Sequence, residues 1–516
     1  MTAATNNSSS PDAPSRSSRI ERLREKSKPF LLAIFAGSMT LDLFNSTGMV
    51  FAQSSIVEQF GVSESEASWT LSAYTLTFGS FLLLAGRAGD IFGHKEIYTV
   101  GLLFFTLFAA LSAGITSSLI ALIVLRAFQG IAAAATIPTA YALIAANYEG
   151  KALEMAVAGL GACQSIGYVT GVVVGGAFAG TSIGYRGQLW LCFGMGAIFT
   201  LLGFLLIPPT RSCRSDMGSL DYGGAVVATA GALLLVLGFT EAQEGWSRAR
   251  VIAPIVSGGV VFALFGIYEE VILPRWLPEV EPLIPRRLWS YKNLVPISAA
   301  TCCYYATFSI LLLNGSQFFV VVQHTSTVLS ALQFLPVAVV AFFLMPVAAH
   351  FYNHRFMPPK WVLAFGQCLC VASVALFSAN EVDSSYWHWS FPSLVVYSFG
   401  SGLFFVNFLN VVYASARLED QGLISGVIQT VAQVSNATAI GIASSFVKGG
   451  TKEQLLEQYK RSFYLAIAFA GLAVLIAVLF VRPISPKPKP TGNSDEEKGG
   501  EESTKIPGSR ANDTIK

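Results

Sequence analysis

Residues 86–95, which read GRAGDIFGHK, decide how this chain is expected to fold. They separate two long apolar runs, 69–85 and 97–115, and a connection this short makes the two runs antiparallel neighbours. The glycines of this stretch permit close backbone approach and positive φ angles. We therefore expect a functional connection between two helices, with an ordinary tight turn as the alternative; its candidate residues are Gly86, Arg87, Asp90, Gly93, His94 and Lys95.

The composition predicts a membrane protein. Of the 516 residues, 53% are hydrophobic and only 12% are charged, whereas soluble domains carry about 25% charged residues. Apolar runs of about 20 residues, the length that crosses a bilayer, recur along nearly the whole chain. The net charge of +2 indicates no nucleic-acid partner. We expect fourteen transmembrane helices, at 30–53, 69–86, 96–115, 119–146, 152–178, 188–207, 220–240, 251–269, 294–321, 327–349, 360–379, 391–414, 423–447 and 462–481.

The two ends of the chain predict its orientation. Residues 1–29 and 483–516 are polar and of low complexity, so both are expected to be disordered tails. No cleavage-site pattern precedes the first span, so we expect no signal peptide. If both termini lie in the cytosol, most Lys and Arg residues of the connections lie there too, as the positive-inside rule requires. We expect a multi-pass protein of the plasma membrane, with the vacuolar membrane left open.

One acid and one base lie deep within predicted spans. Asp42 lies twelve residues after Phe30, where the first span begins, and Arg126 lies in the fourth span. A rise of 1.5 Å per residue places both about midway across the bilayer. Because a charge in hydrocarbon is costly, such residues mark functional sites. We expect Asp42 and Arg126 to be a proton-coupling pair, and the alternative is a structural pair that locks two helices.

Glycines recur in the fifth span, in the line GYVTGVVVGG. Gly167, Gly171 and Gly175 are four residues apart, so they share one helix face that another helix can approach closely. Gly176 completes the set. We expect all four to serve helix packing, and packing without a functional role remains an alternative.

Amides and aromatic side chains in the spans predict a cavity. Such groups either line a wet cavity or bond one helix to another. The sequence contains no ATP-binding loop, metal-ligand cluster or nucleophile–base set, so we expect no enzyme, cofactor or metal site. The residues that we expect to face the cavity are Asn45, Gln129, Gln164, Tyr305, Asn314, Gln317, Asn407 and Gln433.

A weak internal repeat predicts two halves. Aligning the fifth span with the thirteenth pairs Leu153 with Leu423 and Gly171 with Gly441. Parallel repeats of this kind are common in transporters. We expect one six-helix bundle over 30–208, another over 294–482, and two inserted helices with linkers over 209–293.

These motifs resemble the major facilitator superfamily. Residues 86–95 fit its pattern G-x-x-x-D-x-x-G-[RH]-[KR], and Arg126, Gln129 and Gly130 fit the R-x-x-Q-G motif of its fourth span. The run LDLFNSTG and the flanks of the inserted spans resemble the fungal 14-span drug:proton antiporters, over roughly residues 30–482. One departure is Val172, which stands where the antiporter motif G-x-x-x-G-P-x-x-G-G has proline.

The resemblance implies an all-α polytopic membrane protein with the major facilitator fold, built from two six-helix halves and two inserted helices. It implies export of a small organic compound (a drug, toxin or secondary metabolite) in exchange for protons, by alternating access. The protein would work as a monomer in the lipid bilayer, and the connection at 86–95 would latch the inner ends of the halves. Proton-coupled import of a small polar solute or ion is the first alternative, and a non-transporting membrane sensor is the second.

Overall fold

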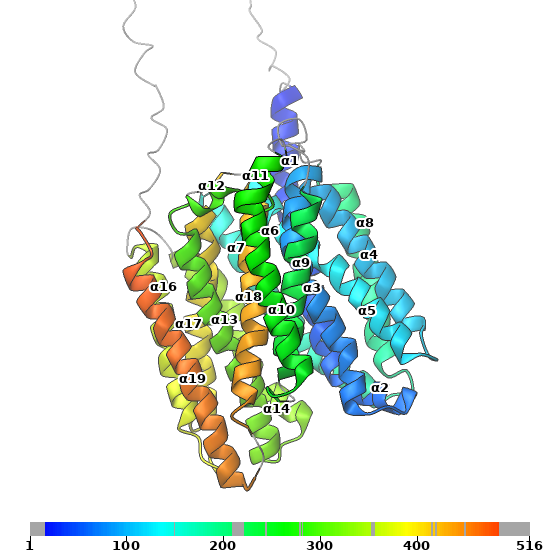
Figure 1. Cartoon of the computed structure of the whole chain (residues 1–516), viewed down its shortest axis with the longest axis vertical. Helices are drawn as coiled ribbons and strands as arrows, with labels where there is room; N and C mark the ends of the chain where they lie inside the picture. The colour runs from blue at the N-terminus through cyan, green and yellow to red at the C-terminus, as the bar shows by residue number, and fades with distance from the viewer. Residues whose placement is uncertain are drawn as a thin grey trace, which may run out of the picture. The chain divides into compact units, whose positions relative to one another are not determined.

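The computed structural model describes residues 16–148, 150–208, 221–242, 245–277, 280, 282–351, 357–413, 416–417, 420–447 and 450–483. Within these ranges the regular structure is entirely helical (Figure 1). Contacts separate residues 1–484 from residues 485–516, and the second unit lies outside the described part of the chain.

The first group of helices packs as one bundle. In it α1 packs against α7 and α8, α3 packs against α5, and α4 packs against α5 and α8. These helices are α1 (Arg16–Phe51), α2 (Gln53–Phe60), α3 (Glu64–Phe92), α4 (His94–Gly114), α5 (Leu119–Ala134), α6 (Thr136–Asn147), α7 (Gly150–Ala179) and α8 (Tyr185–Leu206).

The second group repeats this packing order. In it α13 packs against α18 and α19, α15 packs against α17, and α16 packs against α17 and α19. The two bundles meet where α3 packs on α18 and α7 packs on α15. The second group comprises α13 (Leu294–Gln317), the π-helix η3 (Phe318–Val322), α14 (Thr327–Gln333), α15 (Leu335–Phe351), α16 (Pro359–Ser378), α17 (Ser390–Tyr413), α18 (Gln421–Ser444) and α19 (Lys452–Leu479).

The elements between the bundles form a helical hairpin and a short linker. Helix α9 packs against α3 and α18, one from each bundle, and α10 packs against α9. The elements are α9 (Tyr222–Glu241), α10 (Ala249–Ile267), the π-helix η2 (Tyr268–Ile272), α11 (Leu273–Trp276) and α12 (Arg286–Trp289). The hairpin therefore lies against the contact between the two bundles.

Two helix breaks have proline as their cause. Pro138 cannot donate a backbone hydrogen bond, and its ring crowds the carbonyl four residues earlier, at Ala134, where α5 ends. Pro336 has the same relation to Leu332, and the chain leaves helical geometry between α14 and α15. Helices α5 and α6 together occupy one of the predicted spans, 119–146.

The structure corrects two expectations about the ends of helices. Residues 16–29 are predicted to belong to a disordered tail, but α1 begins at Arg16 because this stretch is rich in the helix formers Arg, Glu, Leu and Lys. Residues 1–15 and 484–516 lie outside the described residues. Gly86 and Gly89 are predicted to lie in a loop, but α3 continues to Phe92 and only Gly93 departs from helical geometry, at φ 104°.

Eleven helices within the described residues are long and apolar enough to cross a membrane. Each of the fourteen predicted spans coincides with a helix or a broken helix, but α3, α15 and α18 are absent from this set of eleven. Helices α3 and α18 carry many hydroxyl and amide side chains, which lowers their hydropathy. The count of fourteen is therefore not established by hydropathy.

We use two terms for the ends of the bundles. The junction end contains Gly93, between α3 and α4, and the far end contains α2 and α14. Figure 1 shows α11 and α12 at the upper, junction end, and α2 and α14 at the lower, far end.

Candidate functional site

Arg126 is completely buried in the first bundle. Its Nη1 donates to Asn45 Oδ1 at 2.9 Å and to Gln129 Oε1 at 2.6 Å, and its Nε donates to the Thr70 carbonyl oxygen at 3.2 Å. The guanidinium on α5 is thus held by neutral groups from α1, α3 and α5. Because buried charges require such hydrogen bonds, this cluster fixes where the positive charge lies.

Asp42 meets this cluster through a tyrosine. The Tyr74 hydroxyl donates to the Asp42 carboxylate, and the Arg126 guanidinium carbon lies 4.5 Å from the centre of the Tyr74 ring. No ion pair joins Asp42 and Arg126 directly within 4.0 Å in this fully described region. The direct pair expected from the sequence is replaced by the order Asp42–Tyr74–Arg126, because Arg126 turns toward Asn45, almost one helical turn further along α1.

The sequence analysis did not identify Tyr74, because a neutral hydroxyl in a membrane costs less free energy than a charge and so does not mark a functional site. The one feature that could have identified it is that Tyr74 is the single tyrosine of α3.

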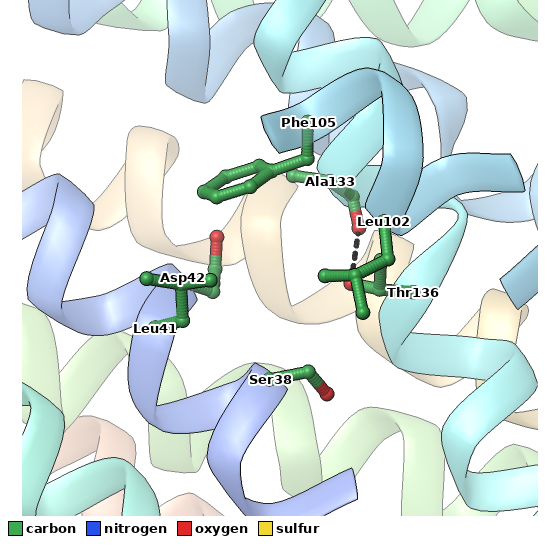
Figure 2. Close-up of a pocket in the computed structure, with 7 residues that line it drawn as sticks. All are labelled: Ser38, Leu41, Asp42, Leu102, Phe105, Ala133 and Thr136. Atoms are coloured by element: carbon green, nitrogen blue, oxygen red, sulfur yellow. Dashed lines mark hydrogen bonds between the residues drawn. The ribbon is translucent and has the colours of Figure 1, made fainter. Parts of the chain in front are cut away.

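The Asp42 carboxylate lies inside the first bundle. Figure 2 shows it above Ser38 and facing Phe105, with Thr136 across a small void. This void has no room for a water molecule. Asp42 as a whole is 9% exposed, so water reaches only a small part of it.

A larger cavity lies between the bundles toward the far end. Its volume is about 680 Å³, which is within the range of sites that hold drug-sized ligands. Helices α1, α3 and α7 of the first bundle, α13 and α18 of the second, and inserted helix α9 all contribute to its wall. The polar and aromatic lining residues are Thr47, Gln53, Ser68, Trp69, Ser72, Thr75, Tyr168, Thr240, Glu241, Phe308, Ser309, Ser316, Gln317, Ser330, Gln433 and Asn436.

Two of the eight residues expected in a cavity, Gln317 and Gln433, line this one. Asn45 and Gln129 hold Arg126 instead, as described above. The other four have local partners or lie elsewhere in the bundles. Gln164 Nε2 lies 3.5 Å from Met39 Sδ, and Asn407 Nδ2 donates to the Leu403 carbonyl oxygen at 2.7 Å. Tyr305 packs on Tyr304 with ring centres 5.2 Å apart, and Asn314 is buried in α13.

Several lining residues were not among the expected set. Trp69, Tyr168 and Phe308 place aromatic rings in the wall, and the Ser309 hydroxyl donates to Asn436. Glu241 lies at the last position of α9. Its signal was present, since it is an acid at the end of an apolar run, but the sequence does not show that α9 borders the cavity.

At the junction end, the two bundles touch through glycines. A Cβ atom on Gly86 would lie 2.8 Å from the Gly422 carbonyl oxygen and 3.4 Å from the Gly426 Cα. Such distances are too short for a side chain, so α3 and α18 approach with their backbones almost in contact. Helix α6 of the first bundle also packs against α18 of the second.

The side chain of Asp90, a residue of α3, lies beside the first residues of α18. A Cβ atom on Gly422 would lie 2.6 Å from Asp90 Oδ1, and His94 Nε2 lies 3.4 Å from that oxygen. A carboxylate beside a helix N-terminus is stabilised by the unpaired N–H groups there. The completely buried Arg87 interacts electrostatically with Asp90, and Lys95 lies in the first turn of α4. Three candidate residues of the connection, Gly86, Asp90 and His94, thus lie close to α18 of the opposite bundle.

The inserted segment and its linker join the same end. Glu269, buried in η2, accepts hydrogen bonds from the backbone N–H groups of Leu283 at 2.5 Å and Ile284 at 3.0 Å, and it interacts electrostatically with Arg87. Arg287 of α12 lies 3.0 Å from Asp420, the residue before α18. Charges from both bundles and the linker therefore surround the junction.

The glycine face of α7 lies against α1. A Cβ atom on Gly167 would lie 2.3 Å from the Thr40 carbonyl oxygen, one on Gly171 would lie 2.0 Å from Thr47 Oγ1, and one on Gly175 would lie 2.3 Å from the Gly48 carbonyl oxygen. Gly176 is the next residue of the same continuous helix. Val172 stands where a proline would kink α7.

Residues 31–440 match the Major Facilitator Superfamily, so the chain belongs to this family of transporters. Chain-length relatives include the low affinity ammonium transporter of Saccharomyces cerevisiae, which is 27% identical over 82% of this chain and 83% of the relative. The multidrug transporter mfsC of Aspergillus fumigatus is 26% identical over 86% of this chain and 85% of the relative.

Solved structures show the same fold. The human organic anion transporter MFSD10 superposes with a TM-score of 0.64 at 16% identity, over 87% of this chain and 98% of that chain. The proton:xylose symporter XylE superposes with a TM-score of 0.60 at 14% identity, over 88% of this chain and 95% of that chain. The chain is thus a multi-pass membrane transporter with an all-helical fold, and its family consists of transporters, not enzymes.

Proposed function

We propose that the protein exports a small organic compound in exchange for protons, by alternating access. The observation that carries this proposal is the 680 Å³ cavity between two bundles that are packed backbone to backbone at the junction end. A binding site reached from one side at a time is what alternating access needs. The multidrug transporter of Aspergillus fumigatus supports an organic compound as the substrate.

The proposed topology has fourteen spans. Helices α3, α14 with α15, and α18 complete the eleven strongly apolar ones, and the polar character of α3 and α18 follows from their place in the cavity wall. The bundles over 30–208 and 294–482 are the halves that rock, and 209–293 is the insertion. If the junction end faces the cytosol, both termini lie there and the cavity faces outward. We place this monomer in the plasma membrane.

The proposed proton site is Asp42. A proton arriving at the carboxylate weakens its attraction for the hydroxyl of Tyr74 and for the positive charge beyond it. Tyr74 then becomes free to turn, and the contact between α1, α3 and α5 loosens. Because a membrane potential contributes about 2.3 kcal/mol per charge per 100 mV, proton entry can drive expulsion of the substrate.

Import is the second candidate function. The ammonium transporter of Saccharomyces cerevisiae is similar over most of both chains, so uptake of a small ion is compatible with this sequence. The cavity volume favours a larger substrate, because ammonium needs only a fraction of about 680 Å³.

The decisive test is accumulation in a transporter-deficient host. Cells that express the protein should retain less of a panel of drugs and metabolites than control cells, and a proton uncoupler should abolish the difference. Higher retention in expressing cells would show import and would contradict the proposed direction. Equal retention across a broad panel, with the protein present in the membrane, would contradict transport of organic compounds.

A further inference from the structure

The cavity wall contains one acidic side chain. Among the lining residues, all of which belong to the described part of the chain, Glu241 is the single acid and there is no Lys, Arg or His. The rest of the wall is made of neutral polar, aromatic and aliphatic groups. A carboxylate in a wall that has no cationic lining residue makes the potential in the cavity more negative.

Glu241 has a partner that a ligand can replace. Arg250, from the second residue of α10, lies with its Nε 3.4 Å from Glu241 Oε2. The Arg250 side chain is 49% exposed, whereas the Glu241 side chain is 15% exposed. Ion pairs with an exposed partner are weak, because water competes for the charge. A positively charged ligand can therefore take the place of Arg250, which can remain solvated outside.

Aromatic and aliphatic groups complete the environment of a cation. Trp69, Tyr168 and Phe308 line the same cavity, and aromatic faces attract positive charge. Aliphatic side chains, including Leu312, Leu313 and Ile440, supply contact for a lipophilic body. A hydrated inorganic cation would use neither feature, so the wall fits an organic cation with apolar substituents.

We propose that inserted helix α9 is part of the substrate site and that Glu241 makes the cavity selective for lipophilic organic cations. This inference rests on the proposed function where it concerns transport of the cation. Binding of the cation alone does not require proton coupling. Helix α9 packs against α3 and α18, one from each bundle, and residues of both helices line the cavity, so a ligand bound at Glu241 lies in a site shared by the two bundles.

The test is equilibrium binding to the full-length purified protein in lipid nanodiscs. The probes are tetraphenylphosphonium, a lipophilic cation, and triphenylphosphine oxide, a neutral molecule of related shape. We expect Glu241→Gln to weaken binding of the cation by about tenfold and to leave binding of the neutral probe unchanged. Arg250→Gln should strengthen cation binding by about threefold, because it removes the competing charge.

The matched control is Glu381→Gln, which removes an exposed acid beyond the end of α16. It should bind both probes as the unmodified protein does. Opposite effects of Glu241→Gln and Arg250→Gln separate recognition from a structural ion pair, since loss of a structural pair would weaken binding in both variants. Unchanged cation binding in Glu241→Gln, or an equal loss for the neutral probe, would overturn the inference.

The outcomes also separate this inference from the proposed function. Cation binding that depends on Glu241, without proton-driven efflux, would contradict export and leave the inference standing. Proton-driven efflux of neutral compounds, with no effect of Glu241→Gln on cation binding, would do the reverse.

Discussion

The junction end and the far end of the bundles are built from different chemistry. At the junction end, Gly86 lies against Gly422, and buried charges such as Arg87 and Asp90 surround that contact. At the far end, neutral hydroxyls, amides and aromatic rings line a cavity with a single acidic side chain. One end therefore holds the halves together with specific contacts, while the other contains the cavity that we propose as the substrate site.

This difference indicates how the two ends take part in a transport cycle. In the proposed alternating-access cycle, the charges and backbone contacts at the junction must separate when that end opens, so we expect them to determine how often it opens. Neutral groups around the cavity cost less to desolvate than charged groups do, so a substrate can replace water there at a lower cost. Variants at the junction should alter rates and conformational populations, whereas variants in the cavity should alter affinity and specificity.

The largest effect is expected outside both ends, at Asp42. Asp42→Asn keeps a hydrogen-bond acceptor for Tyr74 but cannot gain and lose a proton. Uphill accumulation should fall at least about a hundredfold, while downhill exchange persists. Proton-driven uptake and counterflow in inside-out membrane vesicles, where export from the cell becomes uptake, would measure the two activities. The control is Asp383→Asn, which changes an exposed acid at the far end. Survival of uphill transport in Asp42→Asn would remove this residue from coupling.

The next prediction disrupts the glycine contact at the junction end. Gly86→Leu places a side chain where even a Cβ atom lies 2.8 Å from Gly422 O, so α3 and α18 must separate. Overpacking of this kind costs about 1–3 kcal/mol. The thermal midpoint of the purified protein should fall, and a cysteine introduced at the junction end should react faster with a polar thiol reagent. The control is Gly471→Leu, since nothing lies within 4 Å of a Cβ atom there; equal behaviour of both variants would contradict the closed junction.

Much of this arrangement could be predicted from the sequence, because apolar runs determine where helices cross a bilayer. All fourteen runs became helices or broken helices, and residues 86–95 marked the contact between the halves. Helix ends were less predictable, since α1 and α3 extend beyond their apolar runs.

The direction of side chains around each helix axis could not be predicted, because it depends on tertiary packing. For this reason the sequence did not reveal Tyr74 between Asp42 and Arg126, or Glu241 in the wall of the cavity.

A third prediction concerns the linker at the junction. Glu269→Ala leaves the backbone N–H groups of Leu283 and Ile284 without their acceptor, which costs about 1–3 kcal/mol for a buried donor. The linker should become more sensitive to limited proteolysis, and transport should fall severalfold. Glu270→Ala is a close control, because that neighbouring acid is half-exposed and pairs with Arg286 at 2.5 Å. If both variants are cleaved at the same rate, Glu269 does not anchor the linker.

A smaller effect is expected from Asp90→Asn. The variant keeps the shape of the side chain but loses its charge beside the N-terminus of α18 and near Arg87. Charge–helix interactions of this kind contribute about 0.3–1 kcal/mol, so transport should slow by up to about fivefold with normal membrane insertion. Initial rates of transport at matched protein levels would measure the effect. A normal rate would show that the latch depends on packing at Gly86 alone.

The smallest effect tests whether burial, rather than charge itself, distinguishes the two ends. At the far end Arg461 Nη2 lies 2.6 Å from Glu457 Oε1, but the two side chains are 59% and 68% exposed. At the junction Arg287 lies 3.0 Å from Asp420, whose side chain is only 1% exposed. Water and salt screen the first pair, so Arg461→Ala should change neither the thermal midpoint nor transport beyond experimental error.

Arg287→Ala leaves a buried carboxylate with Tyr291 as its remaining described side-chain partner, so the thermal midpoint should fall measurably, and more salt should not remove the difference. Measuring both variants at low and high salt compares the same ion-pair chemistry in two environments. An equal loss in the two variants would mean that charge pairs matter at both ends, and the contrast between a latched junction and a neutral cavity end would then rest on the glycine contacts alone.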